Sequence, residues 1–372
     1  MAPRLGAALT DAQRVSWLRL IRTDNVGPAT FRQLLNRFGS ADAALDALPG
    51  LLQRTGKPAR ITSQAAAEDE IAGLMRYGAR LVGSGEADYP ELLGYIPASP
   101  PLVTMAGGVN LDWRRTVGIV GARNASAAGI KMTRMLATDL GERGYTVVSG
   151  LARGIDAAAH KATLITGTIA VLAGGFDKIY PDENIPLAHD ILDNGGALLT
   201  EMPLGCEPRA RDFPRRNRLV SGLSLGIVVV EAAKRSGSLI TARLALEQNR
   251  DVFAVPGSPL DPRAEGGNAL IQQGARLITC AADIIETLDS ADPANGALFD
   301  RDWEPDLTPE PAPSDDDKSR LLSALTATPI EVDELVRQSG LSVSAMQMLL
   351  LELDLAGQIE WSSGQLVALR YS

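Results

Sequence analysis

Two short loops in the middle of the chain carry residue types that bind phosphate. Residues 121–126 (GARNAS) follow an apolar run at 117–120, and residues 149–154 (SGLARG) follow an apolar run at 146–148. Each loop has a glycine where the backbone must turn, an arginine at its rim, and a predicted helix start behind it. Free N–H groups at a helix start attract anions, and an arginine fork binds phosphate in bidentate fashion. The glycines could serve tight turns alone, with solvated arginines, but the repeat favours a site for a ligand with several phosphates.

A third stretch, residues 213–218 (FPRRNR), closes a predicted loop before a helix at 219–221 and combines an aromatic ring with three arginines and an asparagine. Cations that follow a phosphate backbone, beside a ring that stacks on a base, are typical of a surface for single-stranded nucleic acid. The alternative is an arginine-rich helix start in which Phe213 is buried in the core. Because two anion-binding loops are expected at the same sheet edge, the nucleic-acid interpretation is the better one.

The residues predicted to bind DNA and its phosphates come from these stretches and from turns at neighbouring strand ends. They are Gly121, Arg123, Asn124, Ser126, Ser149, Gly150, Arg153, Gly154, Lys161, Gly174, Gly175, Phe213, Arg215, Arg216, Asn217, Arg218, Ser236, Gly237 and Ser238.

The first loop is not a dinucleotide-binding fingerprint. Its glycines stand at 118, 121 and 129, so the G-x-G-x-x-G spacing is absent, and Ser149 rather than a carboxylate follows the next apolar run. Two cysteines and two histidines give little basis for a metal site and suit a reducing compartment. We therefore expect no nicotinamide cofactor, no other cofactor and no metal.

An enzymatic function is the alternative hypothesis. His160 could act as a base, with Asp156 four residues earlier on one helix face, but neither has an obvious nucleophile partner. We expect His160 to pack within its helix instead. Glu231, followed by Ser-Gly-Ser at 236–238, resembles the arrangement in Rossmann-like phosphoribohydrolases, which suggests a nucleotide N-glycosidase. The same glutamate could instead hold an arginine or backbone donors in place, so no catalytic residue is assigned.

The elements that must position these residues alternate regularly. Residues 116–160 predict a strand, a helix with Ser126 as N-cap, and a second strand, connected in the right-handed sense. Further strands are predicted at 168–172, 198–200, 225–230 and 252–255, and a helix with Ser236 as N-cap extends to 247. Residues 79–112 contain one strand candidate at 80–82 and otherwise indicate a packed connecting segment. This pattern predicts an α/β fold with a Rossmann-like, doubly wound parallel sheet.

Smaller domains are expected at both ends of the chain. The predicted boundaries are 1–78 for a helical domain, 79–288 for the Rossmann-like domain, 289–317 for an acidic, proline-rich linker and 318–372 for a winged-helix domain. In the first, residues 25–28 (NVGP) between two helices resemble the turn of a helix-hairpin-helix, although a plain helical hairpin would look the same.

The last domain is predicted as three helices at 319–327, 332–339 and 342–356, followed by strands at 357–361 and 365–369. Its reading helix, taken as 344–355, contains no lysine or arginine. A helix that reads a DNA groove needs cations for the phosphates, so we expect this domain to bind protein rather than duplex DNA.

The charge of the chain is unevenly distributed. The net charge is −9, yet residues 114–161 carry eight cations against three anions, and residues 207–218 carry five against two. Residues 301–320 instead carry three cations against seven anions. No apolar run is long enough to span a membrane, and the first residues lack the apolar core of a signal peptide, so we expect a cytoplasmic protein.

Several motifs in series resemble one family. They are VGIVGARNAS at 117–126, VSGLARGIDAAAHKA at 148–162, GTIAVLAGGFDKIYPDEN at 167–184, FPRRNRLVSGLS at 213–224, VVVEAAKRSGSLITARLALE at 228–247 and VFAVPG at 252–257. In this order they look like the DNA-processing protein A family, also called DprA or Smf, over roughly residues 89–288. The resemblance implies a homodimer that binds and protects incoming single-stranded DNA and loads the RecA recombinase during natural transformation. The family's Gly-Ser-Arg turn is Gly-Ala-Arg at 121–123 here, so the phosphate role carries over to Arg123 and the serine contact is missing.

Overall fold

The computed structural model describes residues 8–55, 60–290, 314–362 and 366–370. These residues divide into two compact units. One comprises the described residues from 69 to 290, and the other combines the described N-terminal residues up to 68 with the described C-terminal residues from 314. The two units are described separately.

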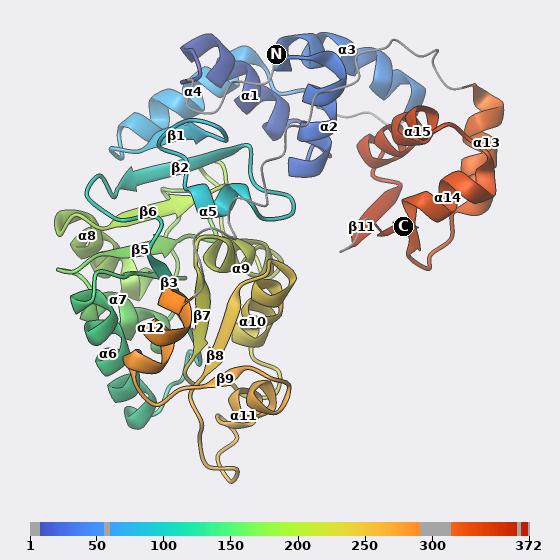
Figure 1. Ribbon diagram of the computed structural model, residues 1–372. Helices are drawn as coiled ribbons and strands as arrows, with labels where there is room; N and C mark the ends of the chain where they lie inside the picture. Colours follow the sequence, from blue (N-terminus) through green and yellow to red (C-terminus); the bar gives the residue numbers. More distant parts are fainter. Residues whose placement is uncertain (1–7, 56–59, 291–313, 363–365, 371–372) are drawn as a thin grey trace. The chain divides into compact units, whose positions relative to one another are not determined.

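Within the described residues, nine strands of the larger unit form one sheet in the order β1-β2-β6-β5-β4-β3-β7-β8-β9 (Figure 1). The strands from β6 to β9 in this order are parallel to one another, whereas β1 and β2 are antiparallel. Their bounds are β1 Arg80–Gly83, β2 Leu102–Gly107, β3 Thr116–Val120, β4 Thr146–Ser149, β5 Thr168–Val171, β6 Ala197–Thr200, β7 Gly226–Val229, β8 Asp251–Ala254 and β9 Arg276–Leu277. The predicted doubly wound α/β fold is confirmed, with an antiparallel pair added at one edge.

The helices of this unit cover both faces of the sheet (Figure 1). They are α5 Glu91–Gly94, α6 Ala127–Glu142, α7 Ile155–Ala162, the short 3-10 helix η1 Asp182–Asn184, α8 Ile185–Asp193, α9 Asp212–Gly222, α10 Gly237–Glu247, α11 Glu265–Gln272 and α12 Ala281–Ser290. Alternate residues of a strand enter different cores, as the two-residue period of a strand requires. Val147 packs with Leu136 and Leu140 of α6, whereas Val148 joins the core that contains Leu219 of α9. Both faces are therefore buried, which explains the continuous apolar runs.

The segment 79–112 was predicted as one strand and a connection, and this prediction was incomplete. Residues 102–107 form the strand β2, which pairs with β1 on one side and β6 on the other. The two prolines at 100 and 101 directly precede β2, and Gly107 ends it with a φ of 70°. The run of prolines hides the strand in the sequence, and its pairing depends on the distant strand β6.

The predicted strand–helix–strand unit around residue 126 is confirmed. Ser126 is the N-cap of α6, where its hydroxyl accepts a hydrogen bond from the N–H of Gly129. Ser236 is likewise the N-cap of α10 and accepts from the N–H of Ser238. These caps satisfy backbone donors that the first turn of a helix leaves unpaired.

The smaller unit contains the N-terminal helices α1 Asp11–Arg22, α2 Pro28–Phe38 and α3 Ala41–Thr55, and part of α4 Gln64–Met75. Thr10 begins α1 with a capping box, and Gly39 ends α2 in the left-handed conformation. Trp17 of α1 and Phe31 of α2 pack edge to face, with ring centroids 5.1 Å apart. The predicted helical bundle is confirmed.

The C-terminal part of this unit is a winged helix. Its elements are α13 Asp315–Ala324, β10 Ile330–Glu331, α14 Val332–Ser339, α15 Val343–Leu355, β11 Ile359–Ser362 and β12 Leu366–Leu369, with strand order β10-β12-β11. Most of the predicted linker, and the tip of the predicted wing, lie outside the described residues. The helix α13 begins earlier than predicted because Ser314 and Asp317 form a capping box.

No helix among the described residues combines the length and the apolar character that crossing a membrane requires.

Candidate nucleic-acid interface

An open groove lies where the sheet changes direction. The chain passes from β3 outward to β4, β5 and β6, then returns to place β7 on the other side of β3. Ligands of open α/β sheets bind beyond the carboxyl ends of the strands at such a point. The loops after β3 and β4 and the start of α10 surround the groove, which encloses about 720 Å³.

The groove is lined by the loops and helix starts that the sequence singled out, together with several residues that it did not. The lining residues are Val120, Gly121, Ala122, Arg123, Asn124, Gly150, Ala152, Asp156, Ala210, Phe213, Pro214, Arg216, Asn217, Val220, Ala233, Arg235, Ser236, Gly237, Ser238, Ile240, Thr241 and Arg263.

A smaller niche opens at one end of the groove around the ring of Phe213. The guanidinium carbon of Arg123 lies 4.9 Å from the centroid of this ring, and that of Arg216 lies 6.0 Å from it. The ring of Tyr180 meets Phe213 edge to face, with centroids 5.7 Å apart. Arg153 also lines the niche, where its Nε lies 3.7 Å from a carboxylate oxygen of Glu183. The niche thus combines aromatic rings with cations, the two groups that contact bases and phosphates.

Arg216 forms the buried floor of the niche. Its side chain crosses Gly150 so closely that a Cβ at position 150 would lie 1.5 Å from Nη1, and Nη1 donates to the carbonyl of Val171 over 3.1 Å. Burial lowers the pKa of Arg216 to about 10, a shift that the nearby charge of Asp156 opposes. Arg216 therefore remains charged at neutral pH and orients the ring above it.

One backbone donor of the first predicted anion loop and two of the second are occupied by carboxylates of the chain itself. At the start of α6, the N–H and the hydroxyl of Ser126 donate to the two carboxylate oxygens of Glu231, over 2.9 and 2.5 Å. In the second loop, the N–H groups of Gly150 and Ala152 donate to Asp156, over 3.1 and 3.3 Å. At the start of α6, the carboxylate of Glu231 occupies the position that a phosphate would take. Arg123 and Arg235 are exposed on the groove lining and can contact anions.

Asp156 is buried at the base of the groove; burial raises its pKa, while Arg216 and the two backbone donors lower it.

Gly154 holds the two loops together. Its φ of 75° lies in the left-handed region, and a Cβ there would approach the carbonyl oxygen of Ala122 to 2.3 Å. The N–H of Ile155 also donates to that carbonyl. The second loop can lie this close to the first because position 154 has no side chain.

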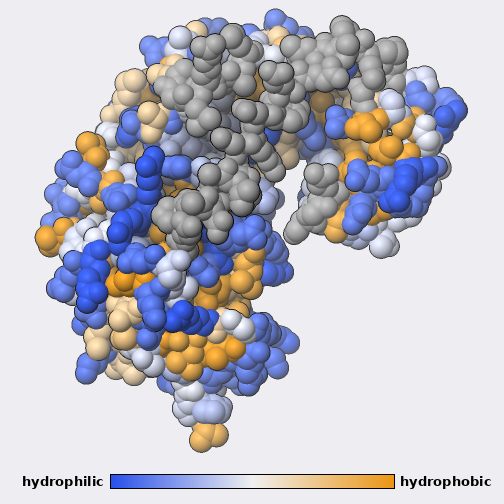
Figure 2. Space-filling model, viewed as in Figure 1, coloured by the Kyte–Doolittle hydropathy of each residue, from blue (hydrophilic) through white to orange (hydrophobic). Residues whose placement is uncertain are grey.

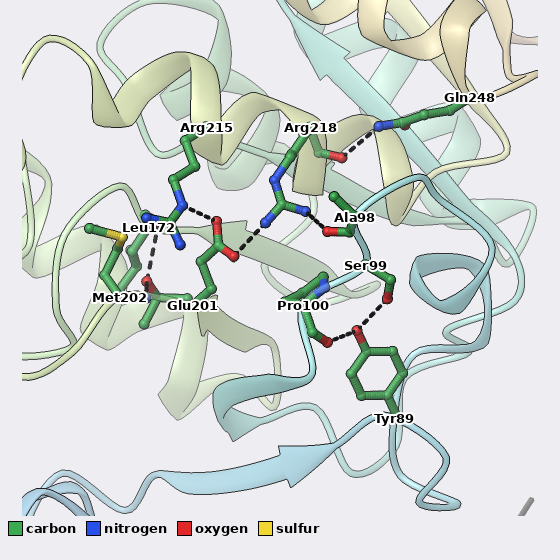
Figure 3. Close-up of polar contacts among 11 residues, drawn as sticks. Tyr89, Ala98, Ser99, Pro100, Leu172, Glu201, Met202, Arg215, Arg218 and Gln248 are labelled. Carbon is green, nitrogen blue, oxygen red and sulfur yellow. Dashed lines mark hydrogen bonds and ion pairs between the residues drawn. The ribbon is translucent and has the colours of Figure 1, made fainter. Parts of the chain in front are cut away.

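The stretch 213–218 was predicted as a loop that continues into a helix, but the structure places it inside α9. At 100° per residue, the helix turns Phe213, Arg216 and Asn217 toward the groove and directs Arg215 and Arg218 elsewhere. Figure 3 shows these last two arginines pointing toward Glu201, which follows β6.

Arg215 and Arg218 share the carboxylate of Glu201. Arg215 Nε donates to Oε1 over 2.9 Å, and Arg218 Nη2 donates to Oε2. Arg218 also donates to the carbonyl of Ala98 over 2.8 Å, in the segment that Tyr89 secures through its hydroxyl (Figure 3). This cluster connects α9 to the antiparallel edge of the sheet and lies outside the groove lining.

Six other residues of the predicted site also lie outside the groove lining, namely Ser126, Ser149, Gly154, Lys161, Gly174 and Gly175, and Arg153 lines only the niche. Ser149 is buried and donates to the carbonyl of Ile119 over 2.6 Å. Gly174 and Gly175 pack against the segment after β6, where the N–H of Gly175 donates to the carbonyl of Cys206. Lys161 is exposed in the last turn of α7, at the end of that helix farthest from the strand tips.

The structure adds three residues that the sequence reasoning left out. Tyr180 enters the niche from the segment after β5, and Arg235 and Arg263 line the other end of the groove. Arg263 is also held by Asp261 through two hydrogen bonds of 3.0 and 2.9 Å. Arg235 directly precedes Ser236, the N-cap of α10. Arg123 and Arg153 likewise lie just before the starts of α6 and α7.

As expected, His160 is a packing residue of α7, one of the helices that cover the sheet. It is fully buried, and its Nδ1 lies 2.7 Å from the hydroxyl of Thr168. Burial, assisted by the charge of Arg216, lowers the pKa of His160 to about 3. The imidazole is therefore neutral and contributes to the packing of the core.

Fold and site together define a Rossmann-like protein with a cation-lined groove at the point where its sheet reverses, accompanied by helical and winged-helix domains. Residues 80–289 match the family described as DNA recombination-mediator protein A. Residues 11–73 match the DprA-like N-terminal HHH domain, and residues 305–365 match the DprA winged helix domain. The chain belongs to the DNA recombination-mediator protein A family.

Relatives from several bacteria support this assignment. The chain is 37% identical to Protein Smf of Escherichia coli over 369 residues, which cover 95% of each chain. It is 45% identical to the DNA processing protein DprA of Bacillus subtilis over 222 residues, 59% of this chain and 74% of that one.

Two solved structures of the same family are similar. The X-ray structure of DprA from Streptococcus pneumoniae has a TM-score of 0.59 and 31% identity, and the match covers 75% of this chain and 98% of that one. DNA processing protein A of Helicobacter pylori, described for its single-stranded DNA binding mode, has a TM-score of 0.52 and 29% identity. That match covers 56% of this chain and 95% of the other.

Proposed function

We propose that the chain binds single-stranded DNA in the groove at the carboxyl ends of β3, β4 and β7. The observation that carries this proposal is the niche in which the ring of Phe213 is flanked by Arg123 and Arg216. Arg123 is exposed and can contact a phosphate of the strand. Arg216 is too buried to contact a phosphate and instead holds the ring of Phe213 in place. A base that lies in the groove, which encloses about 720 Å³ and is lined by Phe213, stacks on that ring while the backbone follows the arginines.

The recessed position of the aromatic ring favours a single strand over a duplex. Phe213 is half-buried among side chains of α9 and the loop after β3, so a base must leave its stack to reach it. Unpaired bases can be splayed in this way, whereas paired bases pay an additional cost. Contacts to phosphates and ring faces carry little sequence information, so binding is nearly independent of sequence.

The comparisons support this proposal through the Helicobacter pylori relative, whose structure is described for its single-stranded DNA binding mode. From the family resemblance we also propose that the protein protects incoming DNA and loads RecA in the cytoplasm during natural transformation.

A homodimer forms part of the same proposal. Figure 2 shows apolar surface near β9, the last strand of the sheet, where Leu277 is 48% exposed. An exposed apolar side chain on an edge strand is a suitable place for a second copy to pack.

The alternative, nucleotide N-glycosidase activity, has no specific observation in its favour. Both carboxylate oxygens of Glu231 accept hydrogen bonds from Ser126, which explains the glutamate as a support for α6. Incubation with nucleoside monophosphates tests this alternative, since an enzyme of that class would release free base.

The substitution Arg123→Glu tests the binding site. The matched control is Arg134→Glu, because Arg134 is exposed on α6 and does not line the groove. We expect Arg123→Glu to weaken binding of a labelled oligonucleotide by about tenfold or more, and to lower the slope of log affinity against log salt by about 0.7, the value for one phosphate contact on a single strand. Arg134→Glu should keep the wild-type salt slope. Equal affinities for the two variants, both folded, would refute the site.

A further inference from the structure

The helix α15 is buried on two opposite faces. Met346, Leu349, Leu350 and Leu353 belong to the core of the winged helix itself. A second stripe, formed by Met348, Leu351 and Leu355, is at most 4% exposed but lies outside that core. A helix that is apolar all round must be covered on both sides.

The N-terminal helices provide the second cover. The helix α15 contacts α2 and α3, which belong to the same compact unit. Thr30 of α2 donates a hydrogen bond from its hydroxyl to a carboxylate oxygen of Asp354. Burial raises the pKa of Asp354, and the bond to Thr30 opposes this shift.

The turn between α1 and α2 closes over the end of α15. Asn25 has a φ of 62° and donates from Nδ2 to the carbonyl of Leu355 over 2.9 Å. This carbonyl lies in the last turn of α15, where carbonyls lack partners within the helix. Gly357 adjoins the same side chain, since a Cβ there would be in ordinary contact with Oδ1 of Asn25, at 3.6 Å. The turn therefore acts as a C-terminal cap for a helix some 330 residues further along the chain.

The two parts in contact are the elements through which such motifs usually bind DNA. In a helix-hairpin-helix, the turn faces a phosphate, and in a winged helix, the third helix enters the groove of a duplex. Here each covers the other. The helix α15 also carries Glu352 and Asp354 but no lysine or arginine, a composition that disfavours phosphates and suits a protein partner.

We propose that the winged-helix module is an intramolecular cover for the N-terminal hairpin, seated through Met348, Leu351 and Leu355 and latched by Asn25 and Thr30. While the cover is closed, neither the hairpin turn nor α15 contacts DNA. The single-stranded DNA groove described above belongs to the other unit, so the cover and the groove are tested independently.

The substitution Asp354→Lys in the full chain opens the cover. It removes the bond to Thr30 and places a cation in a partly buried position. The matched control is Glu360→Lys, an exposed position on β11 of the same module with the same change of charge. The measurement is hydrogen exchange of amides 26–38, far from either substitution in sequence. We expect exchange there to accelerate about tenfold in Asp354→Lys and to remain at the wild-type rate in Glu360→Lys.

A second variant, on the N-terminal side of the contact, keeps the proposal testable if Asp354→Lys unfolds the winged-helix module. Thr30→Val keeps the shape of the side chain but removes the hydroxyl, and it should accelerate exchange of amides 351–357. The proposal would be overturned if exchange of amides 26–38 were unchanged in Asp354→Lys and exchange of amides 351–357 were unchanged in Thr30→Val. The result counts only if the domain that carries each substitution keeps its own protection from exchange.

Duplex binding tests whether the cover masks a DNA surface. Asp354→Lys should bind a short duplex several-fold more tightly than Glu360→Lys, because both add the same charge but only one exposes the hairpin. Equal duplex affinities together with accelerated exchange would show that the contact exists but masks no such surface, and would overturn the masking role.

Discussion

Lowering the pH should destabilise the central sheet through His160. The hydroxyl of Thr168 donates to the carbonyl of Val147, over 2.9 Å, so it accepts from Nδ1–H of His160. This assigns the tautomer and leaves Nε2 unprotonated, buried and without a hydrogen-bond partner among the described residues. Protonation of Nε2 would place a charge in a dry core near the guanidinium of Arg216.

The size of the effect follows from the difference between the two pKa values. The pKa of His160 is lowered to about 3 in the folded protein, against an ordinary value of 6.5. Between these values the unfolded chain binds a proton that the folded chain does not, so stability falls as the pH falls. From pH 7 to pH 5, this single group should reduce the free energy of unfolding by about 2 kcal/mol.

The assay compares His160→Asn with His189→Asn, since His189 is exposed and is the other histidine of the chain. Native-state hydrogen exchange of β4 and β5 amides in increasing urea reports the free energy of unfolding of the central sheet at each pH. The loss between pH 7 and pH 5 should be about 2 kcal/mol smaller in His160→Asn than in the wild type. His189→Asn should retain the wild-type loss. If His160→Asn loses as much stability as the wild type, the buried neutral imidazole is not the cause and the reasoning fails.

Two further predictions concern Glu231, which binds the start of α6, and the edge strand β9. Glu231→Ala leaves the N–H and hydroxyl of Ser126 without their carboxylate partner, and it should cost about 2–3 kcal/mol. Thermal unfolding should show this loss, whereas Glu247→Ala, which removes an exposed ion pair on α10, should change stability by less than about 1 kcal/mol. If a homodimer forms at β9, then Leu277→Glu should yield monomers in light scattering, while Val109→Glu, at an exposed position two residues after β2 in the antiparallel part of the sheet, should not. A dimeric Leu277→Glu variant would move the interface elsewhere.

The internal carboxylates give the groove its particular character. Glu231 and Asp156 already neutralise the helix starts that the sequence suggested as phosphate sites. They keep the two loops rigid in the absence of a ligand, because each satisfies two donors that would otherwise need water or an anion. The groove is also lined by arginine side chains, which suits a ligand whose phosphates follow one another along a flexible strand.

Local chemistry was enough to predict most strands and helices around the groove, and the family followed from the resemblance of several motifs in series. The apolar runs at 117–120 and 146–148 form strands because branched side chains suit a sheet that is buried on both faces. Ser126 and Ser236 cap helices because a short hydroxyl satisfies orphan N–H groups wherever a helix starts. These features depend on neighbours a few residues away. The strand β2 was missed because its pairing depends on β6, about ninety residues further along the chain.

The tertiary structure alone decided which of the candidate residues share a surface. Phe213 and Arg216 face the groove while Arg215 and Arg218 bind Glu201, because α9 begins earlier than expected and its turn sorts neighbours onto different faces. The contact of Glu231 with Ser126 likewise joins positions 105 residues apart, and no local pattern encodes that distance. Residue types and spacing define the chemistry that a segment can perform. Packing between distant segments determines which of those groups remain available to a ligand.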